Sequence, residues 1–335
     1  MSDKIDFIIT WVDGNDPAWR KERDHYAGSE HKEVDTRDSR YRDWETLRYW
    51  FRGVEKFAPW VNKIFFVTCG HLPEWLDTDN PKLQIVKHAD FIPAEYLPTF
   101  SSSAIELYFH KIKGLSEQFV NFNDDMFLLD EVKPSRFFRN GLPCDIGGMT
   151  FNLHSGPFGA AVLLSRTLIN EHFDKQAVIR QHPLKWFNPR YIRASLLNAV
   201  CLSVRKKEFP GFVNPHLPQG YLKKTYDEVW RNCEKDLVRT SRNRFRTYGN
   251  IAPWLFRYWQ LVSNDFSPCN PFKDGVYYLI DDNNVNQIAD CIRRQKKKMI
   301  CINDNDGFIN FESAKDKING AFETLLPGKS SFELF

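Results

Sequence analysis

The sequence predicts an α/β protein in which a mostly parallel sheet is flanked by helices and interrupted by a mixed or helical insertion. Short apolar runs that end at Gly, Asn or Asp occur near both ends of the chain and indicate buried strands. Amphipathic stretches with helical spacing separate these runs, and this alternation is typical of parallel sheets. The middle of the chain, rich in Gly, Pro, Asn and aromatic residues, is less regular. We therefore expect an α/β core made of residues 1–139 and 214–335, with an insertion over residues 140–213.

Local patterns predict the individual elements. The apolar run over 5–12 ends at an Asp-Gly turn and predicts the first strand. Amphipathic spacing predicts a helix over 43–58, which Pro59 ends, and another over 102–113, which Gly114 ends. The same signals predict further strands over 64–68, 83–87, 119–122, 276–280 and 298–302, and further helices over 221–238, 251–263, 284–294 and 312–325.

Composition excludes several classes of protein. The 46 Lys and Arg nearly balance the 43 Asp and Glu, and a net charge of only +3 argues against a nucleic-acid partner. The seven Cys are irregularly spaced without a CxxC pair, so neither a disulfide framework nor a zinc knuckle is expected. There is no apolar run of membrane-spanning length and no signal-peptide pattern. We therefore expect a cytoplasmic protein, with peripheral association at the inner face of the cell membrane as an option.

Acidic and amide residues follow three of the predicted strands. Because ligands of open α/β sheets bind beyond the carboxyl ends of the strands, we expect all three clusters to face one crevice. Their oxygen ligands suit Mg²⁺ or Mn²⁺, and such a metal suits a diphosphate. The alternative is that these residues only form the turns that follow strands. The clusters are Asp13-Gly14-Asn15-Asp16, Asn123-Asp124-Asp125 and Asn303-Asp304-Asn305-Asp306.

Three residues outside these clusters are candidates for acid–base chemistry. Glu106 and His110 lie four apart on a predicted helix, where they either point into the crevice or form a solvent-facing pair. His216 is the single imidazole of a loop stiffened by two prolines. That placement suits a general base, and it equally suits a structural loop histidine.

Basic and aromatic stretches offer further binding groups. The segment 240–249 carries Arg242, Arg244 and Arg246, which either clamp a phosphate or are solvated. The residues 185–188 either present an aromatic surface to a glycan or pack in the core. The chain lacks GxxxxGK[ST], GxGxxG, GxSxG and HExxH patterns, which leaves P-loop, dinucleotide-binding, serine-hydrolase and zincin interpretations without support.

Four segments, in order, resemble the conserved blocks of the Stealth family of sugar-1-phosphate transferases. This family includes bacterial capsular polysaccharide phosphotransferases and the catalytic part of the animal lysosomal-enzyme GlcNAc-1-phosphotransferase. IDFIITWVDGNDPAW (5–19) is similar to the first block, and 41–76 continuing through 96–127 is similar to the second. The segments 214–246 and CINDND (301–306) are similar to the third and fourth.

The resemblance implies a Rossmann-like fold similar to the A-type glycosyltransferases. It implies transfer of a hexose or N-acetylhexosamine 1-phosphate from a UDP-sugar to a glycan hydroxyl, with a phosphodiester formed and UMP released. The process would be capsular or exopolysaccharide synthesis, and the glycan acceptor could be lipid-linked. Residues 140–213 would then be an acceptor-binding region. Trp44 and Trp50 stand where many members of the family have Asn and Ser, which affects the shape expected for the donor pocket.

The resemblance also implies roles for individual residues. His216 would take the proton of the acceptor hydroxyl, and Arg246 would neutralise a phosphoryl oxygen. The catalytic residues would be Glu106, Asp125, His216 and Arg246. Mg²⁺ or Mn²⁺ would be held by Asp124, Asp125 and Asp304. We expect substrate binding by Trp11, Asp13, Gly14, Asn15, Arg42, Arg48, His110, Asn123 and Arg244.

Two alternative functions use the same features. A metal-dependent glycosyltransferase would use the same donor but form a glycosidic bond and release UDP. A non-catalytic glycan- or nucleotide-binding module would show no turnover and no need for His216 or Arg246. Identifying the released nucleotide distinguishes all three.

Overall fold

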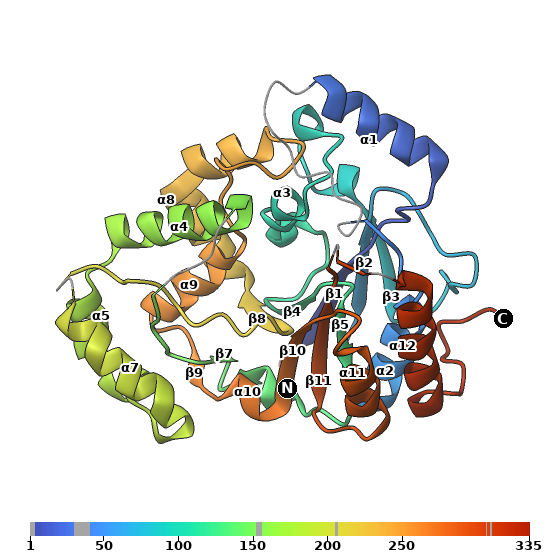
Figure 1. Cartoon of the computed structure of the whole chain (residues 1–335). Coiled ribbons are helices and arrows are strands. Elements are labelled where there is room, and N and C mark those ends of the chain that lie inside the picture. The colour runs from blue at the N-terminus through green and yellow to red at the C-terminus, as the bar shows by residue number, and fades with distance from the viewer. Residues whose placement is uncertain (1–3, 30–40, 152–155, 205–206, 306, 309) are drawn as a thin grey trace.

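A five-stranded sheet in the order β3-β2-β1-β4-β8 forms the centre of the protein (Figure 1). The computed structural model describes residues 4–29, 41–151, 156–204, 207–305, 307–308 and 310–335. Four strands are parallel: β1 (Ile5–Thr10), β2 (Ile64–Thr68), β3 (Leu83–Lys87) and β4 (Gln118–Phe122). The edge strand β8 (Gln219–Leu222) is antiparallel to β4. The predicted α/β class with a Rossmann-like, mostly parallel sheet is confirmed.

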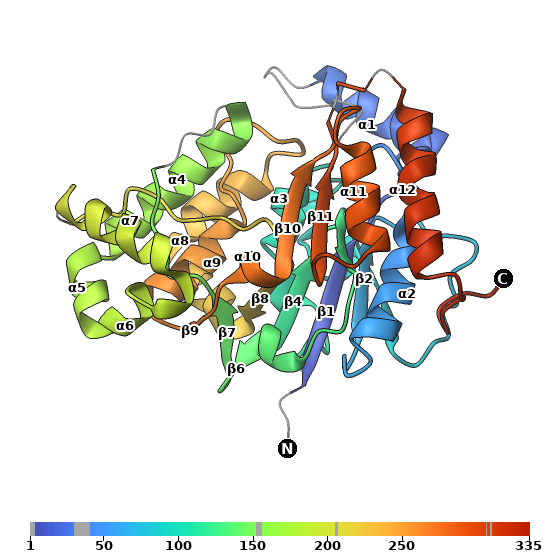
Figure 2. The same cartoon turned by 60° about the horizontal axis from the view of Figure 1, so that its bottom comes forward.

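Both faces of the central sheet are covered by helices, as expected for parallel strands with continuous apolar sequences. In β1, Phe7 and Ile9 pack into the core on one face while Ile8 packs into the core on the other, and all three are fully buried. One face is covered by α2 (Leu47–Phe57), α11 (Val285–Arg293) and α12 (Phe311–Leu325) (Figure 2). The other is covered by α8 (Lys223–Ser241) and α9 (Trp254–Val262).

A second, three-stranded sheet lies beside the first and is drawn in front of it in Figure 2. Its middle strand β11 (Met299–Asn303) is parallel to β10 (Gly275–Leu279) and antiparallel to β5 (Met126–Leu128). Only residues 123–125 separate β4 from β5, so the chain passes from one sheet to the other within that turn. A third small sheet contains β6 (Phe138–Arg139), β7 (Leu142–Asp145) and β9 (Ser267–Pro268).

The insertion over 140–213 is mainly helical, and its helices form a lobe on the opposite side of the molecule from α12 (Figure 1). The expected domain boundaries at 139 and 213 stay a prediction. The helices of the lobe are α4 (Gly156–His172), α5 (Lys175–Gln181), α6 (Pro183–Trp186) and α7 (Ile192–Ser203). The remaining α-helices of the described residues are α1 (Pro17–Ser29), α3 (Ser102–Glu106) and α10 (Pro271–Asp274).

Four predicted helices differ from the structure by two residues or more. Helix α2 begins four residues after the predicted start at 43, and α9 begins three residues after the predicted start at 251. The helix expected over 102–113 is split into α3 and a 3₁₀ turn over Phe109–Lys111. The indole of Trp230 donates to the backbone oxygen of Leu107 at 2.8 Å, which uses a carbonyl that a continuous helix would need. The helix expected over 221–238 begins two residues later, because Tyr221 and Leu222 pair with β4. Within the described residues, no helix combines the length and apolar character that crossing a bilayer would require.

Candidate active site

A pocket opens beyond the carboxyl ends of β1 and β4, where α/β sheets bind ligands. Segments from both sheets and from the loops before α2 and α3 meet there, together with the side chain of Arg246. Of the residues expected in the site, the pocket is lined by Trp11, Arg42, Asn123, Asp124, Asp125, Arg246 and Asp304.

The second and third acidic clusters meet at the junction of the two sheets. The backbone amide of Ile302 donates to the Asp125 carbonyl at 2.8 Å, and the Asn303 side chain donates to Asp125 Oδ2 at 3.0 Å. The pairing of β5 with β11 therefore fixes the position of the Asp125 carboxylate. Its other oxygen, Oδ1, is buried and has no hydrogen-bond partner among the described residues.

The first acidic cluster forms a loop behind the pocket wall. Trp11 lines the pocket, whereas the Asp13 carboxylate accepts a hydrogen bond of 2.8 Å from the Asn15 amide within the loop. Gly14 is required here, because a Cβ at this position would lie 1.7 Å from the carbonyl oxygen of Tyr41. The structure therefore places Asp13, Gly14 and Asn15 beside the pocket without making them part of its lining.

Four carboxylates, those of Asp43, Asp124, Asp125 and Asp304, line the same pocket. Asp124 is in contact with solvent, but the many protein atoms around its carboxyl also desolvate it. This desolvation is the main cause that raises the pKa of the Asp124 carboxyl to about 7, and the negative charges of Asp125 and Asp43 add to it. Burial is also the main cause of the raised pKa of Asp43. The pocket thus holds more negative charge than its own cations offset.

This carboxylate set fits a hard divalent cation such as Mg²⁺ or Mn²⁺. Asp124 and Asp125 are adjacent, and Asp125 keeps one buried oxygen without a partner. Asp304 is less available, because both its oxygens accept hydrogen bonds from Arg42, at 2.6 and 2.9 Å. Asp43 offers a further carboxylate in its place.

Glu106 forms a second polar group with Asn121 and Arg246. The Asn121 amide donates to Glu106 Oε2 at 3.1 Å. Desolvation raises the pKa of Glu106 to about 7, although the nearby Arg246 guanidinium and the Asn121 hydrogen bond oppose this shift. Arg246 also donates to the Ser102 hydroxyl at 2.6 Å, at the start of α3. Helix α3 and β4 therefore hold this glutamate and arginine beside the pocket.

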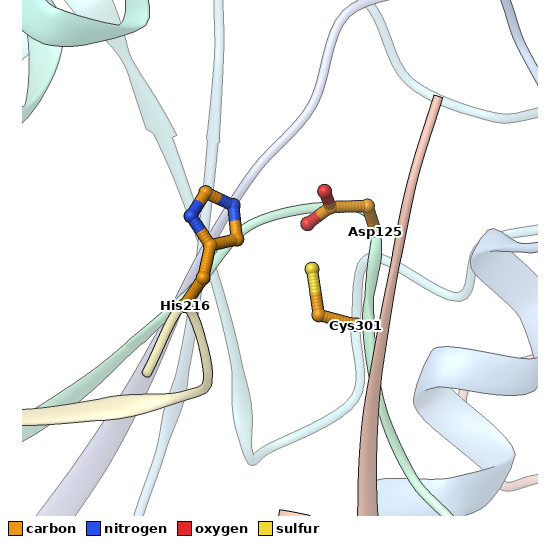
Figure 3. Close-up of side chains that lie close together, drawn as sticks. All are labelled: Asp125, His216 and Cys301. Atoms are coloured by element: carbon orange, nitrogen blue, oxygen red, sulfur yellow. The ribbon is translucent and has the colours of Figure 1, made fainter. Parts of the chain in front are cut away.

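His216, Asp125 and Cys301 lie together, with one ligand atom of each within 4.8 Å of the others (Figure 3). His216 Nε2 is buried and has no hydrogen-bond partner among the described residues. Burial lowers the pKa of His216, and the positive charge of Arg246 adds to this, whereas Asp125 opposes it. The imidazole is therefore neutral near pH 7, the state in which it can accept a proton. Burial and the neighbouring Asp125 raise the pKa of the Cys301 thiol, so it stays protonated.

Helix α9 fixes the loop that carries His216. Arg257 is buried and donates to both oxygens of Asp145 in β7, at 2.7 and 2.8 Å. Its remaining nitrogen, Nη1, donates to Asn214 Oδ1 at 2.9 Å, two residues before His216. His216 itself has a φ of 50°, a strained value for a residue with a side chain. The strain and the buried ion pair show that surrounding structure imposes the position of this imidazole.

Three residues expected to bind substrate lie elsewhere. His110 is buried against the rings of Tyr226 and Trp230 rather than facing the crevice, since its helix breaks before it. Arg48 extends over Trp75, on the outer side of α2. Arg244 extends over the ring of Tyr26.

Trp44 and Trp50, which stand where many family members have Asn and Ser, lie in different environments, and the aromatic stretch of the insertion lies away from the pocket. Trp44 lines the pocket, whereas Trp50 is 1% exposed and packs against Phe122. Trp186 is completely buried, and its indole donates to Asn264 Oδ1 at 3.1 Å. The stretch 185–188 is therefore built around a core residue, which favours the packing interpretation over an aromatic glycan surface.

Sequence reasoning missed Asp43, Ser102 and Cys301. Asp43 follows no strand and so belongs to none of the expected strand-end clusters, although it directly follows Arg42 in the second block. Cys301 lies inside a strand, and only the side-chain alternation of β11 could have placed it on the face toward Asp125. Nothing in the local sequence identified Ser102 as a partner of Arg246.

Comparisons with known proteins agree with this geometry. Three family models of Stealth proteins match this chain. They are conserved region 1 over residues 3–30, conserved region 2 over 40–144 and conserved region 4 over 290–335. The third block, expected over 214–246, stays a prediction. A capsular polysaccharide phosphotransferase WcwK of Streptococcus pneumoniae is 42% identical, with 99% of this chain and 98% of the relative covered. The exopolysaccharide phosphotransferase cps2G of Lactiplantibacillus plantarum is 39% identical, with 98% and 96% covered.

A receptor polysaccharide phosphotransferase, WefC of Streptococcus gordonii, is also 39% identical, with both chains covered completely. The α/β fold, the pocket at the strand ends and these full-length relatives define the protein as a phosphotransferase. The chain belongs to the Stealth family.

Proposed function

We propose that this enzyme transfers a hexose or N-acetylhexosamine 1-phosphate from a UDP-sugar to a hydroxyl of a glycan during capsular polysaccharide synthesis. The products are a phosphodiester and UMP. One observation carries the proposal: an arginine and a group of carboxylates line one pocket, and a neutral imidazole lies against one of these carboxylates, that of Asp125, in a chain similar over its full length to capsular polysaccharide phosphotransferases.

The pocket offers separate groups for the parts of such a donor. Trp11, Trp19 and Tyr41 supply aromatic rings against which a uracil could pack. A divalent cation held by Asp124 and Asp125 would neutralise the diphosphate and the leaving UMP. The guanidinium of Arg246 supplies a planar pair of donors for the transferred phosphoryl group.

In the proposed reaction, His216 Nε2 accepts the proton of the acceptor hydroxyl. The hydroxyl oxygen forms a bond to the β-phosphorus of the donor, and the bond from that phosphorus to the oxygen bridging to the α-phosphate breaks. Arg246 stabilises the charge that develops on the transferred group, and ionised Glu106 orients Arg246. Phosphoryl transfer needs little covalent participation by the protein, so positioning and charge supply most of the rate.

The test is a nucleotide-release assay with a panel of UDP-sugars and a polysaccharide fragment, free or lipid-linked, as acceptor. Release of UMP with one UDP-sugar, and a phosphodiester in the product, is the expected result. Release of UDP would instead assign the protein to glycosyltransferases, and no release with any donor and acceptor would favour a binding function.

A further inference from the structure

Helix α7 lies on the outside of the helical lobe (Figures 1 and 2). It carries a stripe of exposed apolar side chains. Ile192 is 63% exposed, Leu196 66% and Val200 52%, and their spacing of four places them on one face of the helix. Leu184 of the preceding helix α6 is 76% exposed. Single exposed apolar residues are common, but a row of them along one helix marks an interaction surface.

The buried side of α7 is held by polar contacts, which keeps the apolar stripe facing outward. Asn198 is completely buried; its Oδ1 accepts from the Met149 amide at 2.7 Å. Its amide group donates to the carbonyl oxygens of Gly147 and Trp186, at 2.7 and 2.6 Å. Turning the helix to bury the stripe would leave these groups without partners, which is unfavourable inside a protein. The orientation is therefore specified by the fold.

A buried lysine adds a second anchor at the end of α7. Lys175 Nζ donates to the carbonyl oxygens of Cys201 and Val204, at 2.6 and 2.8 Å. These carbonyls lie at the carboxyl end of the helix, which has unpaired acceptors and a partial negative charge. The Lys175 ammonium group therefore holds the carboxyl end of α7 from inside the lobe, and the outer face of the helix stays exposed.

The segment that contains α6 and α7 is basic, whereas the rest of the chain is acidic. Residues 175–207 contain eight Lys and Arg and no Asp or Glu, so the remainder of the chain carries a net charge of −5 although the whole carries +3. Arg190 and Arg193 are exposed beside the apolar stripe, and no ion pair joins either of them to another described residue. An apolar stripe flanked by unpaired cations is the pattern of a helix that lies in a membrane interface.

We propose that α6 and α7 form a docking surface for a membrane rich in anionic lipids. Leu184, Ile192, Leu196 and Val200 would enter the boundary between headgroups and acyl chains, while Arg190 and Arg193 contact lipid phosphates. A second copy of the chain is a poorer occupant, because a twofold contact would bring two acid-free, basic segments together. The proposal is independent of the donor and of the reaction, since it concerns a different face from the pocket.

The test is sedimentation of the full chain with vesicles, either of phosphatidylcholine alone or of phosphatidylcholine and phosphatidylglycerol in equal parts. Binding to the anionic vesicles is expected, with at least about tenfold less binding to the neutral ones and a decrease as salt rises. Leu196→Ser with Val200→Ser, and separately Arg190→Gln with Arg193→Gln, should each lower binding by about tenfold or more.

Matched controls make the outcome specific. Leu334→Ser changes another exposed leucine, 62% exposed near the other end of the molecule, and Arg231→Gln with Lys235→Gln removes the same charge from the exposed side of α8. Both controls should bind as the unchanged chain does. Thermal unfolding verifies that each variant is folded. Equal binding by the stripe variants, or no binding to anionic vesicles, would overturn the proposal. So would a dimer in light scattering that Leu196→Ser with Val200→Ser abolishes, which would assign the stripe to self-association.

Discussion

The side chain of Asn303 donates a 3.0 Å hydrogen bond to Asp125, although the two residues are 178 positions apart in the chain. This contact joins the end of β11 to the turn between β4 and β5. It occupies one oxygen of Asp125, whereas the other is buried without a hydrogen-bond partner among the described residues. The carboxylate lies beside His216 and Cys301. The carboxylate is therefore positioned before any ligand binds, which favours a role in holding charged groups at fixed distances.

If His216 is the general base, His216→Ala lowers kcat by about 10²–10⁴-fold, the range for removing a positioned base. Donor affinity changes little, because the base acts on the acceptor hydroxyl. UMP release and donor binding by calorimetry measure the two effects separately. His182→Ala, at an exposed histidine of the helical lobe, is the control. A kcat for His216→Ala within a few fold of the unchanged enzyme would exclude His216 from the chemistry.

Arg246→Lys is expected to be damaging in spite of the retained charge, because an ammonium group cannot reproduce the two parallel contacts of a guanidinium. We expect kcat and kcat/KM to fall together by about 10²-fold or more, as the lost contact acts on the transition state. Arg242→Lys, at an exposed position four residues earlier, should be almost silent. Equal effects of the two substitutions would contradict a specific role for Arg246.

Removal of divalent cations with EDTA should abolish turnover, and Mg²⁺ or Mn²⁺ should restore it. The Asp124→Asn variant separates binding from stability. It removes repulsion among the pocket carboxylates, so without metal its Tm rises, while the increase in Tm that Mg²⁺ produces is lost. Asp79→Asn, on an exposed turn, should change neither quantity. Full turnover in excess EDTA would remove the metal from the proposal.

Glu106 should make the folded protein less stable as pH rises. Its pKa is raised from the ordinary value of 4.5 to about 7, so between these values the folded chain retains a proton that the unfolded chain has released. The stability linked to this proton is fully present below about pH 4.5 and is lost as pH rises through about 7. Glu106→Gln removes the burial cost of the charge, so its gain in unfolding free energy is larger at pH 8 than at pH 5, by about 1–3 kcal/mol. Denaturant unfolding of this variant and of the exposed control Glu95→Gln measures the difference; a gain independent of pH would contradict the raised pKa.

Asn214→Ala tests whether α9 positions His216. The change leaves Arg257 Nη1 and the Tyr258 hydroxyl without their shared partner. We expect kcat to fall by about tenfold with little change in the KM for the donor, and stability to fall by about 1–2 kcal/mol. Tyr258→Phe removes only one of the two contacts and should retain most of the activity. If Asn214→Ala loses stability but not kcat, the loop contact is structural only.

The sequence was sufficient to predict the central sheet because parallel strands buried on both faces are continuous apolar runs. Strands β1, β2, β3 and β4 begin and end within two residues of the predicted positions. Tyr221 and Leu222 fall within the predicted helix, since only tertiary pairing with β4 distinguishes them from the helix that follows. Local patterns also contain no information that β11 pairs with β5 rather than with the central sheet.

For the site, residues attached to strand ends were easier to predict than residues attached to helices. The turn over 123–125 and the segment 302–304 meet as the strand-end argument requires. His110 lies in the core instead, because Leu107 bonds to Trp230 and the helix that should have aligned His110 with Glu106 stops. One broken turn changes the direction of every later side chain, and spacing along the chain does not reveal such a break.

The pairing of β5 with β11 also has a consequence for biosynthesis. The turn that bears Asp124 and Asp125 leaves the ribosome long before β11 has been translated. Until residues 299–303 are made, β5 lacks its neighbouring strand, and Asp125 lacks both the Ile302 amide and the Asn303 side chain. A nascent chain therefore lacks these contacts at the pocket. The wall that β5 and β11 form together is complete only when β11 has been synthesised and added to the sheet.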